Sequence, residues 1–323
     1  MFRKLWLLFF LLCWAPQPAQ AEPIHGLYLD EEWLISEKPE PTVATLHARL
    51  SAAGIRDLYL QVRNVGASDL GAQSARLLAQ IKARNPLLRL IPFLGRRVCT
   101  TALAKKCLDL RSPSDTQRLQ SQVIALWRLG YDGVQLDLEP VASGDAAFLQ
   151  LLDQLKKLRP AGKLLSVSGY MFEPSTEIQA RVHISPRGDA TPLYWSRAYY
   201  REVLRRVDAL VLMNYDTGIR SAEEYRHWTT YQLRELLALQ RELGGRSVQL
   251  GIPAYKYGRR GLFSPQAETA VVAIAVAQAV LHDRCPAPVG LTPYHESELP
   301  PELWPALVGY TQDSAAHCRH PTP

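Results

Sequence analysis

Short apolar runs alternate with longer amphipathic stretches along most of the chain. The apolar runs cover residues 24–29, 57–62, 88–94, 133–139, 164–169, 209–215, 248–253 and 289–293. Between them, spaced apolar positions predict helices over 42–53, 114–129 and 222–243. Strands alternating with helices indicate a parallel sheet, and eight repeats in a chain of this length predict a single (β/α)8 TIM barrel. An open, doubly wound sheet is the alternative, but the glycine-rich phosphate loop that it would place after an early strand is missing.

The first residues have the composition of an export signal. Two basic residues precede an apolar run over 5–14, and the small-residue triplet Ala19-Gln20-Ala21 follows. This order predicts a secretory signal peptide over 1–21 and a barrel domain over 22–323. The apolar run is too short to span a bilayer, and no later run is long enough. We therefore expect a secreted or periplasmic protein, cleaved near Ala21, without a stable membrane anchor.

The charge balance gives little indication of a partner. The chain has 37 Lys and Arg against 31 Asp and Glu. Loss of the two basic leader residues reduces the net charge from +6 to about +4, and the charges are interspersed. No basic tract with interleaved aromatic residues is present, so we expect no nucleic-acid partner. We also expect a monomer without cofactor or metal.

Four cysteines remain after the leader, namely Cys99, Cys107, Cys285 and Cys318. An even number in an exported chain predicts two disulfides, which allow three pairings. Pairing Cys99 with Cys107 would close a short loop, and pairing Cys285 with Cys318 would hold the C-terminal tail. A metal site is the alternative, although the spacing lacks the Cys-x-x-Cys pairs of zinc sites.

The predicted strand ends collect carboxylates and aromatic rings. The active site of such a barrel lies at the carboxyl ends of its strands. Those ends supply Asp30, Glu31, Trp33, Arg63, Asn64, Arg96, Arg97, Asp137, Glu139, Tyr170, Phe172, Tyr215, Asp216, Tyr255, Tyr257, Tyr294, His295 and Glu296. Sugars offer hydroxyls to carboxylates and C–H faces to rings, so this set favours a carbohydrate-binding cleft. Tyr194 and Trp195, farther along a long loop, are either substrate platforms or a hydrophobic staple before a helix near Ser196.

The fourth run carries the most specific chemistry. Because side chains alternate along a strand, Gln135, Asp137 and Glu139 share one face. Burying two carboxyl groups without partners would cost several kcal/mol each. A functional site is therefore favoured, with a buried ion pair or a helix N-cap as the alternatives.

Two segments carry a family resemblance. The segment 132–139, Asp-Gly-Val-Gln-Leu-Asp-Leu-Glu, resembles the Asp-Gly-x-Asp-x-Asp-x-Glu signature of family 18 glycoside hydrolases. The segment 211–216, Val-Leu-Met-Asn-Tyr-Asp, is similar to the Met-x-Tyr-Asp end of that family's sixth strand. They fall on the fourth and sixth predicted strands, as in the family. The chain thus resembles a divergent member of the chitinase and endo-N-acetylglucosaminidase type.

The resemblance implies a retaining hydrolysis of β-linked N-acetylhexosamine glycans, such as chitin oligomers, peptidoglycan or N-glycans. The substrate's acetamido group replaces the enzyme nucleophile of ordinary retaining glycosidases. By resemblance, Glu139 is the general acid, Asp137 orients the acetamido group, and Tyr215 bonds its carbonyl. The predicted substrate-binding residues are Asp132, Gln135, Met213, Asp216, Trp33, Tyr170, Tyr255 and Tyr294.

Three departures from the family are visible. Gln135 stands where the signature has its second Asp, and the third strand, 90–95, lacks the family's Ser-x-Gly-Gly. Near the eighth strand, 294–296 reads Tyr-His-Glu instead of carrying the tryptophan on which those chitinases seat the sugar. Trp304 is expected to pack a final helix.

Three other functions remain as alternatives. A catalytically silent barrel could bind the same glycans. A barrel glycosidase with an enzyme nucleophile would cleave sugars lacking the acetamido group, and would need a carboxylate about 5 to 5.5 Å from the acid, from Asp30, Asp216 or Glu296. A metal-dependent hydrolase ranks last, because the strand ends offer only His295 among the histidines.

Overall fold

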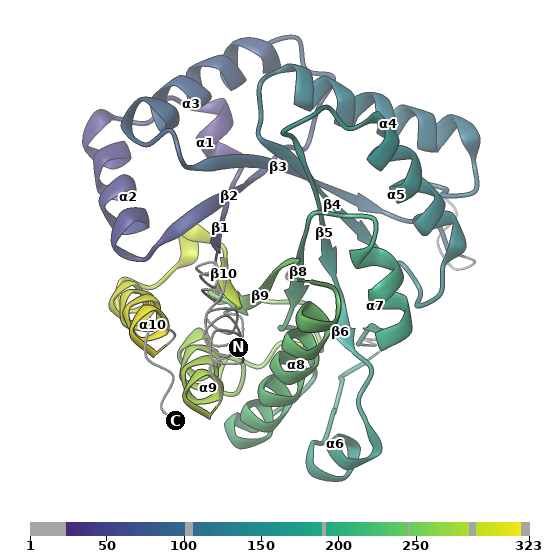
Figure 1. Ribbon diagram of the computed structural model, residues 1–323, viewed down its shortest axis with the longest axis vertical. Coiled ribbons are helices and arrows are strands. Elements are labelled where there is room, and N and C mark those ends of the chain that lie inside the picture. The colour runs from purple at the N-terminus through teal and green to yellow at the C-terminus, as the bar shows by residue number, and fades with distance from the viewer. Residues whose placement is uncertain (1–23, 101–105, 189–191, 245, 284–288, 318–323) are drawn as a thin grey trace, which may run out of the picture.

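The computed structural model describes residues 24–100, 106–188, 192–244, 246–283 and 289–317. Eight parallel strands form one sheet in the order β1-β2-β3-β4-β5-β8-β9-β10 (Figure 1). They are β1 (His25–Leu29), β2 (Ile55–Gln61), β3 (Arg89–Arg97), β4 (Gly133–Glu139), β5 (Leu164–Gly169), β8 (Ala209–Met213), β9 (Ser247–Pro253) and β10 (Gly290–Tyr294). The fold is therefore the predicted (β/α)8 barrel, and the open-sheet alternative is wrong. The predicted leader, Cys285 and Cys318 lie outside the described residues.

The first and last strands close the barrel. The backbone N–H of Leu291 in β10 donates to the Nδ1 atom of His25 in β1 over 3.0 Å. Burial lowers the pKa of His25 to about 4, so its ring is neutral and can accept this hydrogen bond. The eight predicted apolar runs each correspond to a strand, although β2 begins two residues earlier than expected and β3 continues to Arg97.

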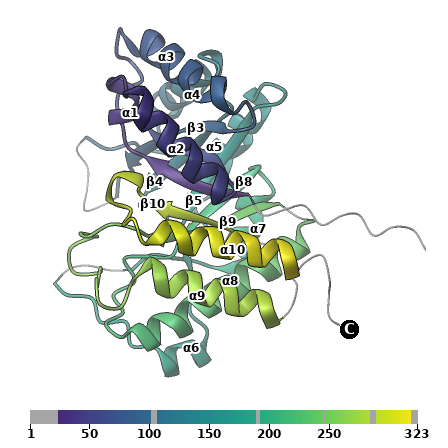
Figure 2. The same cartoon turned by 90° about the vertical axis from the view of Figure 1, so that its left-hand side faces the viewer.

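Helices surround the strands on the outside (Figure 1). The longer ones are α2 (Glu40–Ala52), α3 (Leu70–Arg84), α4 (Pro113–Arg128), α5 (Ala146–Leu158), α8 (Ala222–Glu242), α9 (Ala270–Asp283) and α10 (Leu303–His317). Shorter ones are α1 (Glu32–Ile35), α6 (Thr176–Arg181), α7 (Arg197–Leu204) and the 3-10 turn η1 (Glu296–Glu298). The three predicted helices match α2, α4 and α8, and α8, α9 and α10 lie side by side (Figure 2). In the described ranges, every helix is too short or too polar to cross a membrane.

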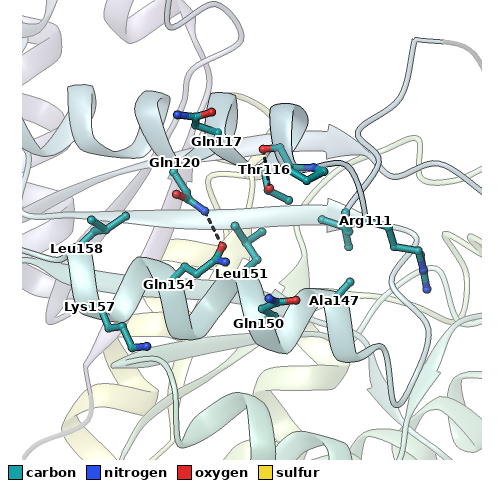
Figure 3. Close-up of a pocket in the computed structure, with 12 residues that line it drawn as sticks. Arg111, Thr116, Gln117, Gln120, Ala147, Gln150, Leu151, Gln154, Lys157 and Leu158 are labelled. Atoms are coloured by element: carbon teal, nitrogen blue, oxygen red, sulfur yellow. Dashed lines mark hydrogen bonds between the residues drawn. The ribbon is translucent and has the colours of Figure 1, made fainter.

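A surface groove lies between α4 and α5, outside the barrel (Figure 3). Its volume is about 700 Å³, and Gln120 donates to Gln154 across it over 2.6 Å. The side chains that line it are amides, cations and apolar groups, without a carboxyl group among the described residues. Its lining thus differs from the carboxyl ends of the strands, where the sequence predicts carboxylates.

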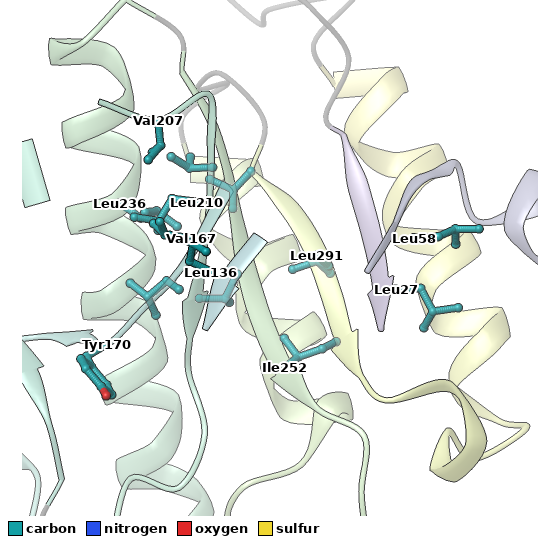
Figure 4. Close-up of a cluster of buried hydrophobic side chains, with 14 of the residues drawn as sticks. Leu27, Leu58, Leu136, Val167, Tyr170, Val207, Leu210, Leu236, Ile252 and Leu291 are labelled. Carbon is teal, nitrogen blue, oxygen red and sulfur yellow. The ribbon is translucent and has the colours of Figure 1, made fainter. Parts of the chain in front are cut away.

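Two apolar layers hold the barrel together. Outward-facing aliphatic side chains of the strands, including Leu27, Leu136 and Leu210, pack against the helices (Figure 4). Inside the barrel, a smaller cluster is built from Tyr28, Tyr59, Ile91, Phe93 and Val211. Because each strand is buried on both faces, its sequence reads as a nearly continuous apolar run, which is why the strands could be recognised.

A polar network fills the amino-terminal half of the barrel interior. The carboxyl group of Asp57, which is 0% exposed, accepts from Arg89 Nε over 2.6 Å and from Gln249 Nε2 over 2.9 Å. Tyr59 donates to Gln249 Oε1 over 3.1 Å. Burial raises the pKa of Asp57, whereas the charge and hydrogen bond of Arg89 oppose that rise. The network is thus a desolvated ion pair completed by neutral partners.

The connection after β5 contains the short paired strands β6 (Met171–Phe172) and β7 (Tyr194–Trp195). Ser196 caps α7, and Trp195 before it contacts Tyr200 in the first turn with ring centroids 5.3 Å apart. This is the spacing of a hydrophobic staple. Trp195 is 1% exposed, so its ring is not a substrate platform. Trp304 is likewise buried in α10, the predicted final helix.

A disulfide joins Cys99 to Cys107 just after β3. This is one of the predicted pairings. The loop that it closes is also held by backbone hydrogen bonds from Cys99 to Leu108 and from Leu108 to Arg97. The disulfide and residues 106–108 therefore lie beside the carboxyl end of β3.

Candidate active site

Asp137 and Glu139 lie at the carboxyl end of β4 and share a hydrogen bond. A pocket of about 60 Å³ opens beside Glu139. It is lined by Glu139, Tyr170, Met171, Leu193, Met213, Tyr215, Asp216, Arg259 and Leu262. The β5, β8 and β9 ends of the barrel thus converge on one of the two carboxyl groups.

The surroundings of the pair give the two acids different pKa values. Burial raises the pKa of Glu139 to about 8, the negative charge of Asp137 adds to the rise, and Arg259 opposes it. Burial also raises the pKa of Asp137, to about 6, while hydrogen bonds from Ser168 and Glu139 stabilise its anion. The two groups titrate as a pair, and their surroundings favour the proton on Glu139 over Asp137. A proton donor and a carboxylate are therefore present side by side.

Three tyrosine rings form an aromatic wall beside this pair. Tyr215 stacks on Tyr294 with centroids 5.7 Å apart, and Tyr255 meets both rings edge-on at 5.7 and 5.8 Å. Burial raises the pKa of Tyr215 far above its usual value, so its phenol keeps its proton. Tyr215 can therefore donate a hydrogen bond to a bound carbonyl oxygen.

Asp216 follows Tyr215 in a left-handed backbone conformation, with φ of 54°. Its Oδ1 atom accepts from the Tyr255 hydroxyl over 3.2 Å and from the backbone N–H of Arg259 over 2.8 Å. A Cβ atom on Gly258 would lie 2.4 Å from this same oxygen. The loop after β9 can approach Asp216 so closely only because residue 258 has no side chain.

Gln135 lies deeper inside the barrel than the carboxyl pair and does not line the pocket. It accepts a hydrogen bond from the Tyr28 hydroxyl over 2.9 Å and donates to Ser166 Oγ over 3.3 Å. With 0% exposure, this position would penalise a second negative charge beside Asp137. The amide fills the position without that cost.

The predicted substrate-binding residues divide into two groups. Met213, Asp216, Tyr170, Tyr255 and Tyr294 gather around the pocket or in its aromatic wall. The structure does not bring Asp132 or Trp33 to it.

Asp132 lies before β4, at the opposite end of the barrel. It pairs with Lys82 over 2.9 Å and accepts from the backbone N–H of Leu90 over 2.8 Å. Trp33 is 5% exposed, donates to Glu296 over 3.2 Å, and lines a separate surface pocket beside α2. Both side chains therefore have local structural roles.

The sequence analysis missed Ser168 and Arg259. Ser168 could have been found, because alternation along β5 places it on the inward face with Ser166. Arg259 lies in an irregular loop about 120 residues after Glu139, where no periodic pattern marks it. Only the folded chain places its charge near the carboxyl pair.

Replacing Ser168 by alanine should move the acidic limb of the pH–activity profile to higher pH. The lost hydrogen bond stabilises the Asp137 anion, so its removal raises the pKa of Asp137 by about one unit. If activity requires ionised Asp137, the loss of kcat/KM on acidification then begins at higher pH. Ser143→Ala, at an exposed serine, is the control. Identical acidic limbs in the wild type and the Ser168 variant would contradict this role.

Fold and site together define a (β/α)8 barrel with a carboxyl pair and an aromatic wall at the carboxyl ends of its strands. No family model and no curated protein matches the sequence. Among solved structures, the spore cortex-lytic enzyme SleL of Bacillus cereus has a TM-score of 0.55 at 13% identity, covering 91% of this chain and 76% of that chain. A family GH18 chitinase of Cycas revoluta has a TM-score of 0.55 at 13% identity, with 90% and 99% covered.

The chitinase-like agglutinin of Robinia pseudoacacia is also similar, with a TM-score of 0.54 at 14% identity over 90% of this chain and 99% of that chain. At such low identities, these likenesses establish the fold alone. The fold is thus similar to that of family 18 glycoside hydrolases.

Proposed function

We propose that this protein is an exported glycoside hydrolase that cleaves β-linked N-acetylhexosamine glycans by retaining, substrate-assisted acid catalysis. The observation that carries the proposal is the carboxyl pair of Asp137 and Glu139, half-buried on one face of β4 at its carboxyl end, where Glu139 lines the pocket. The fold neighbours support it, since they include a spore cortex-lytic enzyme and a chitinase. Residues 1–21 would direct export and then be cleaved off near Ala21, and the active form is proposed to be a monomer without cofactor.

Glu139 is the proposed general acid. It donates its proton to the oxygen of the glycosidic bond as that bond breaks, and a pKa raised to about 8 keeps it protonated at neutral pH. After cleavage, the Glu139 carboxylate can accept a proton from the attacking water. The proposed role needs no movement of the backbone, because Glu139 already lines the pocket.

Asp137 and Tyr215 are the proposed partners of the acetamido group. The Oδ1 atom of Asp137 has no hydrogen-bond partner among the described residues, although it is buried. An acetamido N–H would satisfy it, and the carboxylate would stabilise the positive charge of the cyclic intermediate that the acetamido oxygen forms at the anomeric carbon. The phenol of Tyr215 would donate to the same carbonyl.

The remaining wall residues are proposed to position the sugar. Asp216, Tyr255 and Tyr294 belong to the wall, and Tyr170 and Met213 line the pocket. At about 60 Å³, the pocket is much smaller than a drug-sized ligand site. Substrate entry would therefore require a side-chain shift, and Arg259 is the exposed member of the lining.

Hydrolysis of a defined substrate panel tests the proposal. Chitooligosaccharides, peptidoglycan fragments, N-glycans and acetamido-free β-glucans are incubated with the mature protein. We expect cleavage of acetamido sugars alone, with retention of anomeric configuration and inhibition by a thiazoline analogue of N-acetylglucosamine. Cleavage of acetamido-free glucans, insensitive to the thiazoline, would instead favour an enzyme nucleophile, for which Asp216 in the same pocket is the candidate. Binding without cleavage would favour the silent glycan-binding barrel.

A further inference from the structure

A second pocket lies one strand away from the carboxyl pair. Its volume is about 290 Å³, and it is formed by the end of β3, residues 106–108 and α4. The lining residues are Arg96, Arg97, Lys106, Cys107, Leu108, Asp115, Arg118, Leu119 and Gln122. Four of them are cationic and one is acidic, so the pocket carries an excess of positive charge.

The acidic residue does not neutralise this excess. Asp115 bonds Arg118 over 2.6 Å and the backbone N–H of Asp109 over 3.0 Å. Arg96 donates to two neutral acceptors, the carbonyl of Gly95 over 2.7 Å and the amide oxygen of Gln122 over 3.3 Å. In the described part of the chain, no ion pair is formed by Arg96, Arg97 or Lys106.

The desolvation of Arg96 adds to this imbalance. Arg96 is only partly exposed, and burial lowers the pKa of its guanidinium. A guanidinium that is partly removed from water, without an opposite charge, gains when an anion binds. Guanidinium groups suit planar carboxylates in particular, because two N–H groups can donate to the two oxygens.

The pocket is connected to the carboxyl pair by strand register. Arg97 is the pairing partner of Glu139 across β3 and β4, and Gly95 is the partner of Asp137. Paired residues of parallel strands point to the same face, and neighbouring strands lie about 4.8 Å apart. Gly95 is exposed, and a Cβ atom there would meet only Asp137 within 4 Å. A glycan bound at the pair can thus pass over Gly95 toward Arg97.

We propose that this basic pocket binds a carboxylate carried by the substrate glycan, and that the enzyme therefore prefers acidic N-acetylhexosamine glycans to neutral ones. The inference rests on the proposed function and narrows its substrate class. Arg97 and Arg96 are the specificity-determining residues, and Arg97 belongs both to the pocket and to the strand face of the pair.

The test compares two oligosaccharides of equal length. One contains N-acetylglucosamine and N-acetylmuramic acid with a free lactyl carboxylate, and in the other this carboxyl group is reduced to the alcohol. We expect the wild type to cleave the acidic form with the higher kcat/KM. Arg97→Gln should lower the ratio of acidic to reduced kcat/KM about tenfold, the usual scale for one lost charge-assisted hydrogen bond. Arg226→Gln, at an exposed arginine of α8, should retain the wild-type ratio.

Binding to the inactive Glu139→Gln protein separates this inference from the proposed hydrolase. If the wild type cleaves neither glycan, but adding Arg97→Gln to the Glu139→Gln protein weakens binding of the acidic form about tenfold, the pocket is supported and the hydrolase fails. If both glycans are cleaved with a ratio that neither Arg97→Gln nor Arg96→Gln changes, the pocket assignment is wrong and the hydrolase stands. Inorganic phosphate or acetate that abolishes the preference of the wild type would support an anion site in the same pocket.

Discussion

Replacing Glu139 by glutamine should lower kcat by about three orders of magnitude, while thermal stability and glycan binding remain close to those of the wild type. The amide has the size of the protonated acid but cannot donate a proton to the leaving oxygen, and general acid catalysis contributes roughly 10²- to 10⁴-fold. Because burial and Asp137 already hold Glu139 protonated near pH 7, the substitution removes little charge from the folded state. Stopped assays on a soluble chitooligosaccharide, thermal unfolding followed by circular dichroism, and calorimetric binding measure the three quantities.

The matched control is Glu177→Gln on α6, where the glutamate is exposed and pairs with Arg181 over 3.1 Å. Its rate should equal that of the wild type. If the Glu139 variant also keeps the wild-type rate, Glu139 is not the acid and the proposed mechanism fails. If the variant loses both activity and thermal stability, the lower rate would result from unfolding and not from the missing proton donor.

Replacing Asp57 by alanine should lower the free energy of unfolding by about 3 kcal/mol, the low end of the range for breaking a buried ion pair from one side. The substitution would leave Arg89 without its counterion and Gln249 Nε2 without its acceptor inside the barrel. Uncompensated polar groups of this kind account for most of the cost. Urea unfolding followed by circular dichroism gives the value.

An exposed ion pair provides the comparison. Asp153 contacts Arg206 over 3.0 Å with its side chain 46% exposed, and Asp153→Ala should cost less than about 1 kcal/mol. Equal effects at the two positions would show that the interior network contributes no more than a surface pair. Asp57 lies near the amino end of β2, away from the carboxyl ends of the strands, so the remaining folded fraction should keep the wild-type selectivity in the substrate panel.

The strands of the barrel could be predicted because their sequences report burial on two faces. Alternation along the strand predicted that Asp137 and Glu139 share one face. The site was predicted at the carboxyl ends of the strands because active sites of such barrels lie there. Asp132 was grouped with them because it belongs to the same sequence motif. It precedes β4, and at that end of the barrel an aspartate serves to fix Lys82 and the start of β3. A residue of a sequence motif thus indicates a chemical role only where it lies at the carboxyl end of its strand.

Other features depend on contacts between distant segments. Trp33 follows β1 as a substrate platform would, yet its indole N–H bonds Glu296, which is 263 residues away, and its ring packs beside α2. Burial and the charge of Asp137, which the strand pattern places beside it, raise the pKa of Glu139, whereas Arg259, which only the folded loop brings near, opposes that rise. Ser168 is an intermediate case, because alternation predicts its direction but not its hydrogen bond to Asp137.

Gln135 affects which substitutions the interior of this barrel can accept. The residues that bond it, Tyr28 and Ser166, form a neutral layer beneath the carboxyl pair. With an amide there, the inward face of β4 holds two protonatable groups, so the acid strength of Glu139 is governed on its own strand by Asp137 alone. Mutations of Tyr28 or Ser166 can then alter packing without adding or removing a proton at the carboxyl pair. Substitutions in this neutral layer can thus change the stability of the barrel without changing the pH dependence of the carboxyl pair. The two properties can evolve separately.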